Sequence, residues 1–222
     1  RNTQMIPSAT MWITHVVLAE AILRIPPKTR GDILECGCYK GASTASLSAV
    51  CDLVKRRLIV ADSFCGLPDE EGGKIAVYSH LKQFGKYEKG MYSAGLEEVK
   101  SNIKKYGKIK ACSFLPGFFS ESLKSLNKNF ALAFLDVDLE SSIKDCIKYI
   151  WPRLFDGAYL YTDDSCDIEV VKVWFNDSWW KKEIGTPAPG YVGSGCGLPI
   201  DISHSGLGYA QKVTNINQIY NE

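Results

Sequence analysis

Ile33-Leu34-Glu35-Cys36-Gly37-Cys38-Tyr39-Lys40-Gly41 is the stretch that decides the fold. Its apolar start predicts a short strand over 32–36, and its two glycines, spaced G-x-x-x-G, predict a tight turn. A helix over 42–54 and a second apolar strand over 57–61 are expected to follow. Strand, turn, helix and strand in this order form a unit whose two strands run parallel and are joined by a right-handed crossover.

Strands and helices alternate outward from this unit over the rest of the chain. We expect further helices over 10–25, 93–106, 120–126, 141–154 and 168–182, and further strands over 110–116, 130–136, 158–162 and 208–213. This alternation predicts an α/β fold, a doubly wound and mostly parallel sheet with helices on both faces, formed as a single domain over 1–222. Ligands of such sheets bind beyond the carboxyl ends of the strands, where the strand order reverses.

Two of the expected helices carry informative side chains. The N-terminal helix over 10–25 is expected to bury one apolar face, made of Trp12, Val16, Ala19 and Leu23. The helix over 168–182 contains Trp174 and Trp179, which indicate a core position or a subunit contact, so assembly into a homo-oligomer is open.

The composition excludes several classes of partner. Over 222 residues the net charge is +1, from 26 basic and 25 acidic residues, so neither a nucleic acid nor an anionic membrane is expected to bind. Apolar runs stay shorter than the roughly 18 residues of a membrane span. The eight cysteines are scattered and include no pair of C-x-x-C motifs, which favours free thiols in a reducing compartment, such as the cytoplasm.

The glycine turn also indicates a ligand. A dinucleotide site needs G-x-G-x-x-G, and neither register of Gly37 supplies it. The carboxylate of Glu35 would repel a pyrophosphate but attract the ammonium group of S-adenosylmethionine (SAM). We therefore predict SAM, with Glu35, Gly37, Gly41 and Ser43 at its site; the alternative is a turn with no ligand.

An acidic residue ends the second strand. Asp62 follows the apolar run Leu58-Ile59-Val60-Ala61, roughly 20 residues after the glycine turn, where an acid can accept hydrogen bonds from a ribose. NAD enzymes use the same position, so Asp62 indicates a nucleoside without saying which. The alternative is that Asp62 only caps the turn at Ser63.

Four carboxylates follow two later strands. Asp136 and Asp138 come after the strand over 130–136, and Asp163 and Asp164 after the strand over 158–162. Such carboxylates repel one another unless a cation lies among them, and oxygen ligands with several waters suit Mg²⁺. The alternatives are solvated loop acids and a helix cap at Asp164.

The segment 66–92 is polar, rich in glycine and long for a connection, which predicts a lid over the site. Its aromatic residues either line a substrate site or pack the lid onto the domain. His80, inside this segment, is a candidate catalytic residue. His15 is more typical of a packed or surface residue, and His204 lies in a polar loop.

Several stretches together carry a family resemblance. They are LECG with Lys40-Gly41, DSFCGLP over 62–68, YSAGLEEVKSNIKKYG over 92–107, GFFSESL over 117–123, LDVDLESS over 135–142, Pro152-Arg153-Leu154 with Gly157, and Asp163-Asp164. In these motifs and their order the chain resembles the macrocin O-methyltransferase (TylF-type) family of SAM-dependent methyltransferases.

The resemblance implies a class I, Rossmann-like methyltransferase fold and a Mg²⁺-dependent O-methyltransferase. It implies that the metal ligands are Asp136, Asp163 and Asp164. It also implies that the SAM site is lined by Glu35, Gly37, Asp62, Ser63, Gly117 and Phe118, and we expect Phe64 and Asp136 beside them. The chain departs from the family pattern at Glu140, where a Tyr is usual, and at Ser165, where an aromatic residue is usual.

The expected reaction is methyl transfer from SAM to a hydroxyl group of a small molecule, such as a sugar, a phenol or another natural product. Asp136 or Asp138 is expected to help remove the hydroxyl proton, with His80 as a further candidate. The alternatives are a methyltransferase that needs no metal, a SAM-binding protein without catalysis, and an oxidoreductase on the same sheet, against which the glycine spacing argues.

Overall fold

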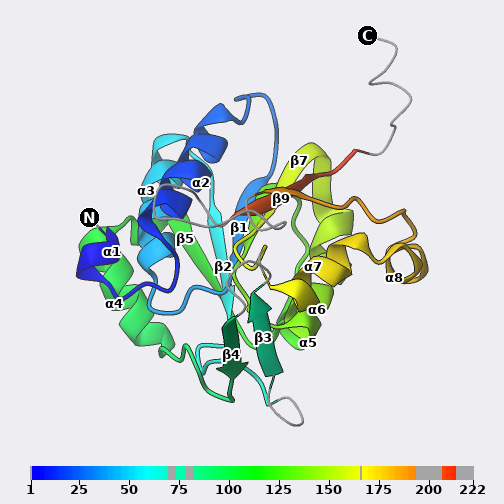
Figure 1. The fold of residues 1–222 in the computed structure, drawn as a ribbon. Helices are drawn as coiled ribbons and strands as arrows, with labels where there is room; N and C mark the ends of the chain where they lie inside the picture. Colours follow the sequence, from blue (N-terminus) through cyan, green and yellow to red (C-terminus); the bar gives the residue numbers. More distant parts are fainter. Residues whose placement is uncertain (1, 70–73, 79–82, 166, 194–206, 214–222) are drawn as a thin grey trace.

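The structure is a computed structural model that describes residues 2–69, 74–78, 83–165, 167–193 and 207–213. Its strands are β1 (Asp32–Cys36), β2 (Leu58–Asp62), β3 (Lys74–Tyr78), β4 (Gln83–Tyr87), β5 (Cys112–Pro116), β6 (Phe130–Leu135), β7 (Leu154–Thr162), β8 (Val192–Gly193) and β9 (Gly208–Gln211). Seven of them form one sheet in the order β5-β2-β1-β6-β7-β9-β8, and β3 pairs with β4 in a separate hairpin (Figure 1).

The main sheet has the predicted winding. Strands β5, β2, β1, β6 and β7 pair in parallel, and only β9 runs antiparallel to its neighbours β7 and β8. From β1 the chain moves outward through β2 to β5, and it then returns to the other side of β1 as β6. The predicted doubly wound, mostly parallel sheet is therefore confirmed, and its order reverses between β1 and β6.

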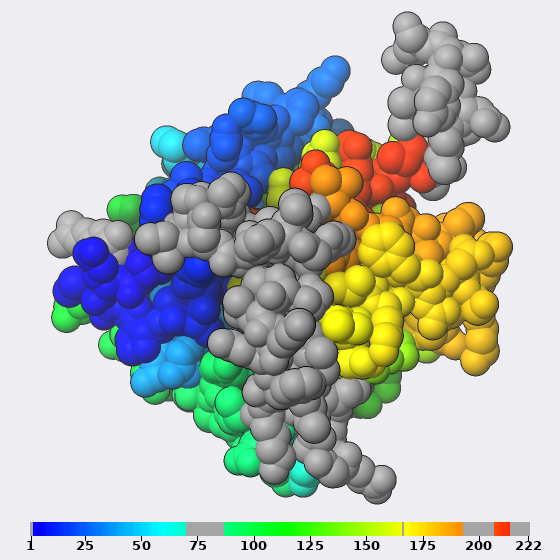
Figure 2. Space-filling view, in the orientation of Figure 1, coloured from blue at the N-terminus to red at the C-terminus, as the bar shows by residue number. Residues whose placement is uncertain are grey.

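Helices cover both faces of this sheet. They are α1 (Asn2–Met5), α2 (Trp12–Arg24), α3 (Ala42–Leu53), α4 (Leu96–Tyr106), α5 (Phe119–Ser122), α6 (Glu140–Ile150), α7 (Ile168–Phe175) and α8 (Asp177–Glu183), with short 3-10 turns at Ile109–Ala111, Leu123–Ser125 and Trp151–Arg153. Helices α2, α3 and α4 lie on one face, and α5, α6 and α7 on the other (Figure 1). The space-filling view shows the N-terminal helices and the α7–α8 pair at opposite sides of the molecule (Figure 2).

Alternation along the strands builds two cores. Ile33 of β1 packs in a buried cluster with Leu18 and Ile22 of α2, whereas its neighbour Leu34 packs in the cluster that contains Ile143 and Ile147 of α6. Strand β6 is buried at every position, as a central parallel strand must be when helices cover both of its faces.

The N-terminal helix buries a different face from the predicted one. Trp12 is 58% exposed, and Val16 and Leu23 are each 52% exposed. The buried residues are Thr14, His15, Leu18 and Ile22. The prediction was wrong because two of the buried side chains are polar, and a search for apolar periodicity passes over them.

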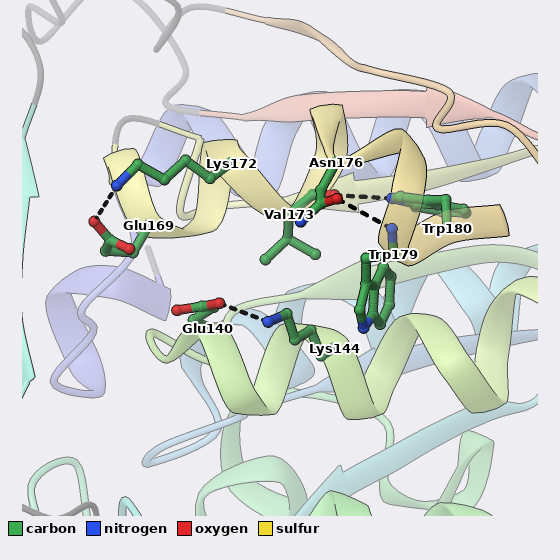
Figure 3. A network of polar contacts seen from close by, with 8 residues as sticks. All are labelled: Glu140, Lys144, Glu169, Lys172, Val173, Asn176, Trp179 and Trp180. Carbon is green, nitrogen blue, oxygen red and sulfur yellow. Dashed lines mark hydrogen bonds and ion pairs between the residues drawn. The ribbon is translucent and has the colours of Figure 1, made fainter. Parts of the chain in front are cut away.

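The predicted helix over 168–182 is two helices. Asn176 separates α7 from α8, and its side-chain oxygen accepts a hydrogen bond from the backbone N–H of Trp179 at 3.0 Å (Figure 3). Asparagine is a favoured N-cap residue, so it ends one helix and begins the next. Trp174 is fully buried, which confirms the core interpretation for it, whereas Trp179 is half-buried and packs against the same core.

The sequence did not predict the β3–β4 hairpin, which lies inside 66–92. Its base is held by two backbone hydrogen bonds, Leu67 N–H to Met91 O and Gly90 N–H to Leu67 O, both 3.0 Å. The role of this segment as a lid stays a prediction.

Six cysteines fall among the described residues as free thiols, which agrees with the prediction for them. Cys36, Cys38, Cys51, Cys112 and Cys146 are buried, and Cys65 is exposed. Within the part of the chain that the structure describes, no helix combines the length and the apolar character needed to cross a membrane.

Two glycines with the same backbone conformation provide a test of the packing between β1 and β6. Gly37 and Gly157 both have φ of +82°, but a Cβ on Gly37 would lie 1.8 Å from the carbonyl oxygen of Asp136, whereas a Cβ on Gly157 meets nothing within 4 Å. We expect Gly157→Ala to lower the free energy of unfolding by about 1–2 kcal/mol, the cost of a left-handed alanine. Gly37→Ala should cost on the order of 4 kcal/mol or more. Chemical denaturation followed by circular dichroism measures both, and equal costs would contradict the packing described here.

Candidate active site

A pocket of about 370 Å³ opens at the point where the strand order reverses. Its lining comes from the carboxyl ends of β1, β2 and β6, from the starts of α5 and α6, and from the two ends of the segment 66–92. The lining residues are Ala9, Gly37, Tyr39, Asp62, Ser63, Gly66, Leu67, Pro68, Asp69, Met91, Tyr92, Phe118, Phe119, Ser120, Asp136, Val137, Asp138, Ser141, Ser142 and Asp145. This is where a doubly wound sheet binds its ligand.

The floor of the pocket is made by the glycine turn. The backbone N–H of Asp136 donates to the carbonyl oxygen of Cys36 at 2.9 Å, so the ends of β6 and β1 meet. Gly37 then turns away with φ of +82°, a conformation that glycine adopts without strain. Because no Cβ stands between them, Gly37 and Asp136 both face the pocket.

Asp62 joins the two turns beside the pocket. Its Oδ2 accepts the N–H of Cys38 at 2.7 Å, and its Oδ1 accepts the N–H of Phe64 at 2.7 Å. The first bond fixes the glycine turn, and the second caps the turn after β2. A carboxylate can accept about four hydrogen bonds, so Asp62 keeps acceptor capacity for a ribose.

Five predicted cofactor contacts lie outside the pocket lining: Glu35, Gly41, Ser43, Phe64 and Gly117. Glu35 is fully buried, and its Oε2 accepts the hydroxyl of Thr44 at 2.6 Å. Its Oε1 has no hydrogen-bond partner among the described residues, and burial raises the pKa of Glu35 to about 7. Gly41 is the left-handed residue that precedes α3, and Ser43 is buried inside that helix. Glu35, Gly41 and Ser43 therefore lie next to the glycine turn but not in the pocket lining.

The loop after β5 forms one wall. Gly117, with φ of +128°, donates its N–H to the carbonyl oxygen of Asp62 at 2.9 Å. This turn directs Phe118, which is 43% exposed, into the lining. Phe64 packs instead against Phe114, with ring centroids 6.3 Å apart, and does not line the pocket.

Asp138 stands at a strained turn. Leu139 donates its N–H to the carbonyl oxygen of Val137 at 2.6 Å, which closes a three-residue turn around Asp138 with φ of +60°. A left-handed conformation is uncommon for a residue other than glycine, although aspartate tolerates it better than most. Asp138 lines the pocket, and its carboxyl group is hydrogen-bonded to Tyr87. A backbone outlier at such a place indicates a functional role.

Asp163 and Asp164 follow β7 and lie outside the pocket lining. Asp163 Oδ1 accepts the hydroxyl of Thr14 at 3.4 Å. Asp164 Oδ2 accepts the N–H groups of Val137 at 3.2 Å and of Asp138 at 3.1 Å. Asp164 therefore holds the loop that carries Asp138, and Asp163 connects the site to α2.

The Mg²⁺ site predicted at Asp136, Asp163 and Asp164 stays a prediction. Among the residues that the structure describes, no group of three or more His, Cys, Asp or Glu side chains is placed to hold a metal ion. The carboxylate oxygens are of the kind that Mg²⁺ prefers, but Asp163 and Asp164 are turned toward the protein partners described above.

The acidic residues at the two strand ends repel one another. Burial, followed by the charges of the neighbouring carboxylates, raises the pKa of Asp136 and of Asp138 well above the usual range. The same causes raise the pKa of Asp163 to about 7, and burial raises that of Asp164 to about 6. The site is therefore poised to bind cationic groups or protons.

The mouth of the pocket is formed by segments far apart in the sequence. Tyr39 of the glycine turn contacts Tyr92 edge to face, with ring centroids 5.7 Å apart, and Ala9 lines the same opening. His80, the candidate catalytic residue from this region, lies outside the described residues, as does His204.

His15 is a packed residue, as expected. Its Nε2 lies 2.9 Å from the hydroxyl of Thr10, and its Nδ1 lies 3.0 Å from the hydroxyl of Ser46. Burial lowers the pKa of His15 to about 4. A neutral imidazole therefore holds the segment that contains Ala9 against α3.

The two departures from the family pattern do not enter the lining. Glu140, at the start of α6, pairs with Lys144 at 2.6 Å, and Lys144 lies over the ring of Trp179 at 6.0 Å (Figure 3). Ser165 is fully buried, and its carbonyl oxygen accepts the hydroxyl of Tyr191. Both residues have structural roles in the packing of α6, α7 and β8.

Sequence reasoning missed much of the pocket wall. The lining residues without a prediction are Ala9, Tyr39, Phe119, Ser120, Val137, Ser141, Ser142 and Asp145, whereas Gly66, Leu67, Pro68, Asp69, Met91 and Tyr92 belong to the segment 66–92 that was predicted to lie over the site. The three on α6 carried a usable signal, because polar residues at positions i, i+1 and i+4 after an acidic strand end share a helix face.

Known proteins share both the sequence pattern and this geometry. The family described as Macrocin-O-methyltransferase (TylF) matches residues 5–189. The chain belongs to this family.

Two curated relatives of this TylF-family chain come from Streptomyces. The 8-demethyl-8-(2,3-dimethoxy-alpha-L-rhamnosyl)-tetracenomycin-C 4'-O-methyltransferase of Streptomyces olivaceus is 32% identical over 139 residues, which cover 60% of this chain and 52% of that protein. The demethyldecarbamoylnovobiocin O-methyltransferase of Streptomyces niveus is 29% identical over 143 residues, covering 60% and 52%. The chain spans about half the length of these relatives.

A solved structure supports the fold. The O-methyltransferase NovP superposes with a TM-score of 0.67 at 21% identity, covering 90% of this chain and 79% of that one. At this identity the likeness shows the fold alone, and it confirms the class I methyltransferase architecture expected for a TylF-family chain.

The raised pKa of Asp163 gives a prediction about stability. Between pH 4 and pH 7 the folded chain binds more protons at Asp163 than the unfolded chain does, so this group makes the free energy of unfolding fall as the pH rises. Asp163→Asn removes that dependence and keeps an oxygen for Thr14. We expect the variant to gain on the order of 2 kcal/mol relative to wild type between pH 5 and pH 7.5.

Urea denaturation at both pH values measures this difference. Asp52→Asn, on α3 away from the pocket, is the control and should follow the wild-type curve. If the free energy of unfolding changed equally with pH in wild type and in Asp163→Asn, the raised pKa of Asp163 would be contradicted.

Proposed function

We propose that this chain is a SAM-dependent O-methyltransferase that acts on a hydroxyl group of a small molecule. One observation carries the proposal: a TylF-family chain has a 370 Å³ pocket at the strand-order reversal, with Gly37, Asp62 and Asp136 in its lining. The names of the relatives support the reaction, since both are O-methyltransferases of natural products.

The pocket suits the charges of SAM. The acidic side chains in its lining are Asp62, Asp69, Asp136, Asp138 and Asp145, and the described lining contains no Lys, Arg or His. A ligand that carries a sulfonium and an ammonium group is attracted to such a lining. The ribose hydroxyls would donate to Asp62, and the methionine end would lie over the Gly37 turn, with Glu35 adding to the negative potential from behind.

The transfer itself needs alignment and a proton acceptor. A lone pair of the acceptor hydroxyl attacks the methyl carbon, the carbon–sulfur bond breaks, its electrons stay on sulfur, and S-adenosylhomocysteine leaves. Holding the hydroxyl in line with the methyl group can lower the barrier by about 7–11 kcal/mol. The hydroxyl proton must pass to a base during this step.

Asp138 is the base we propose, with Asp136 beside it. Asp138 lines the pocket, and a strained turn fixed by Asp164 holds its position. Burial and the neighbouring carboxylates raise the pKa of Asp138, so once it is deprotonated its carboxylate binds a proton more strongly than an ordinary one. His80 remains a proposed participant.

We include Mg²⁺ in the proposal, with Asp136, Asp163 and Asp164 as its ligands. The reasons are that Mg²⁺ prefers carboxylate oxygens and that the negative charges of these three side chains repel one another. When bound, Mg²⁺ would lower the pKa of the acceptor hydroxyl and orient it. Binding would require Asp163 and Asp164 to turn away from their present partners.

The first test is calorimetric titration of S-adenosylhomocysteine into the protein, with Mg²⁺ and then with EDTA. We expect saturable binding at a ratio of one to one, and no binding of NADH, because the Gly37 turn offers no site for a pyrophosphate. Methyl transfer to a panel of hydroxylated glycosides and phenols then tests the reaction. Absence of S-adenosylhomocysteine binding would overturn the proposal, and transfer unaffected by EDTA would remove Mg²⁺ from it.

Asp138→Asn tests the base. Asparagine tolerates the left-handed turn, so the pocket should persist while the proton acceptor is lost. We expect kcat to fall by about 10²–10⁴ and the affinity for S-adenosylhomocysteine to change little. Asp52→Asn, on α3 and outside the pocket lining, is the matched control. An unchanged kcat in Asp138→Asn would exclude Asp138 as the base.

A further inference from the structure

One end of the pocket lies between α5 and α6, which pack side by side (Figure 1). Phe118, Phe119 and Ser120 line it from the start of α5. Ser141, Ser142 and Asp145 line it from α6, where their spacing places them on one face of the helix. The reaction proposed above uses none of the three residues on α6.

The rest of the pocket determines what reaches this end. If Asp62 takes the ribose and the Gly37 turn takes the methionine part, the base attached to the ribose extends away from Gly37. Phe118 and Val137 in the lining offer apolar surfaces for the faces of a flat ring. The ring edge, which is polar, then needs a hydrogen-bonding partner on the wall beyond.

Asp145 is available for that role. It is half-buried, and no described residue hydrogen-bonds its side chain or pairs with it. The nearby lysines are occupied, since Lys124 pairs with Glu121 at 2.9 Å and Lys148 with Glu183 at 3.1 Å. A carboxylate accepts hydrogen bonds and does not donate them, so it selects a ligand edge that carries a donor.

We infer that Asp145 recognises the base of the cofactor by accepting a hydrogen bond from the exocyclic amino group of adenine. The inference rests on the proposed function and deepens it, because it assigns the specificity of the same pocket for adenine. A base with a carbonyl oxygen at that position presents an acceptor to the Asp145 carboxylate and is rejected.

The experiment compares two ligands that differ at this position, S-adenosylhomocysteine and S-inosylhomocysteine, whose hypoxanthine carries an oxygen in place of the amino group. Calorimetry measures both against the full chain and against Asp145→Asn, which can donate from its amide. We expect wild type to prefer S-adenosylhomocysteine by at least about tenfold. Asp145→Asn should bind S-adenosylhomocysteine more weakly and S-inosylhomocysteine more tightly, so that the preference is lost or reversed.

Two further variants keep the result specific. Asp145→Ala should lose affinity for S-adenosylhomocysteine without gaining any for S-inosylhomocysteine. Asp52→Asn removes a charge from α3, away from the pocket lining, and should keep the wild-type preference.

The outcomes separate the two proposals. Wild-type and Asp145→Asn proteins with the same ratio of affinities for the two ligands would overturn the inference about Asp145 alone. Failure of the wild-type protein to bind S-adenosylhomocysteine would overturn the proposed function as well. A melting curve of each variant confirms that the compared proteins are folded.

Discussion

The contact between the Cα of Gly37 and the carbonyl oxygen of Asp136 is the constraint on which the site depends. It allows the ends of β1 and β6 to meet with no side chain between them. The glycine turn and the acidic loop after β6 then face one space, and Asp62 binds the turn from the side of β2. A larger residue at position 37 would separate these parts, and each would remain well formed but without a common pocket.

The chain holds a concentration of buried carboxyl groups that its fold alone does not neutralise. Backbone N–H groups partly compensate Asp62 and Asp164, whereas Asp136 and Asp138 have strongly raised pKa values. Such groups lower the stability of the empty protein and are retained where a ligand or a reaction uses them.

Sequence reasoning succeeded where one short stretch determines its own structure. The local sequence from Ile33 to Gly41 is enough to predict a strand and a turn. Asp62 in turn marks the carboxyl end of the next strand, where ligands of such sheets bind. It failed where distant partners decide. Thr14 can be buried because it hydrogen-bonds Asp163, and His15 because it hydrogen-bonds Ser46. The apolar periodicity of α2 does not reveal either partner. Asn176 breaks a helix whose apolar pattern continues, and Asp145 joins the pocket only because α6 packs beside α5.

The hydrogen bond between Thr14 and Asp163 joins residues 149 positions apart in the sequence. During synthesis the polar face of α2 is made well before its partner at the end of β7. At a synthesis rate of about 5–20 residues per second, roughly 7–30 s pass between the synthesis of Thr14 and that of Asp163. The loop that carries Asp138 therefore acquires the partner that holds it, Asp164, only after the end of β7 has been made.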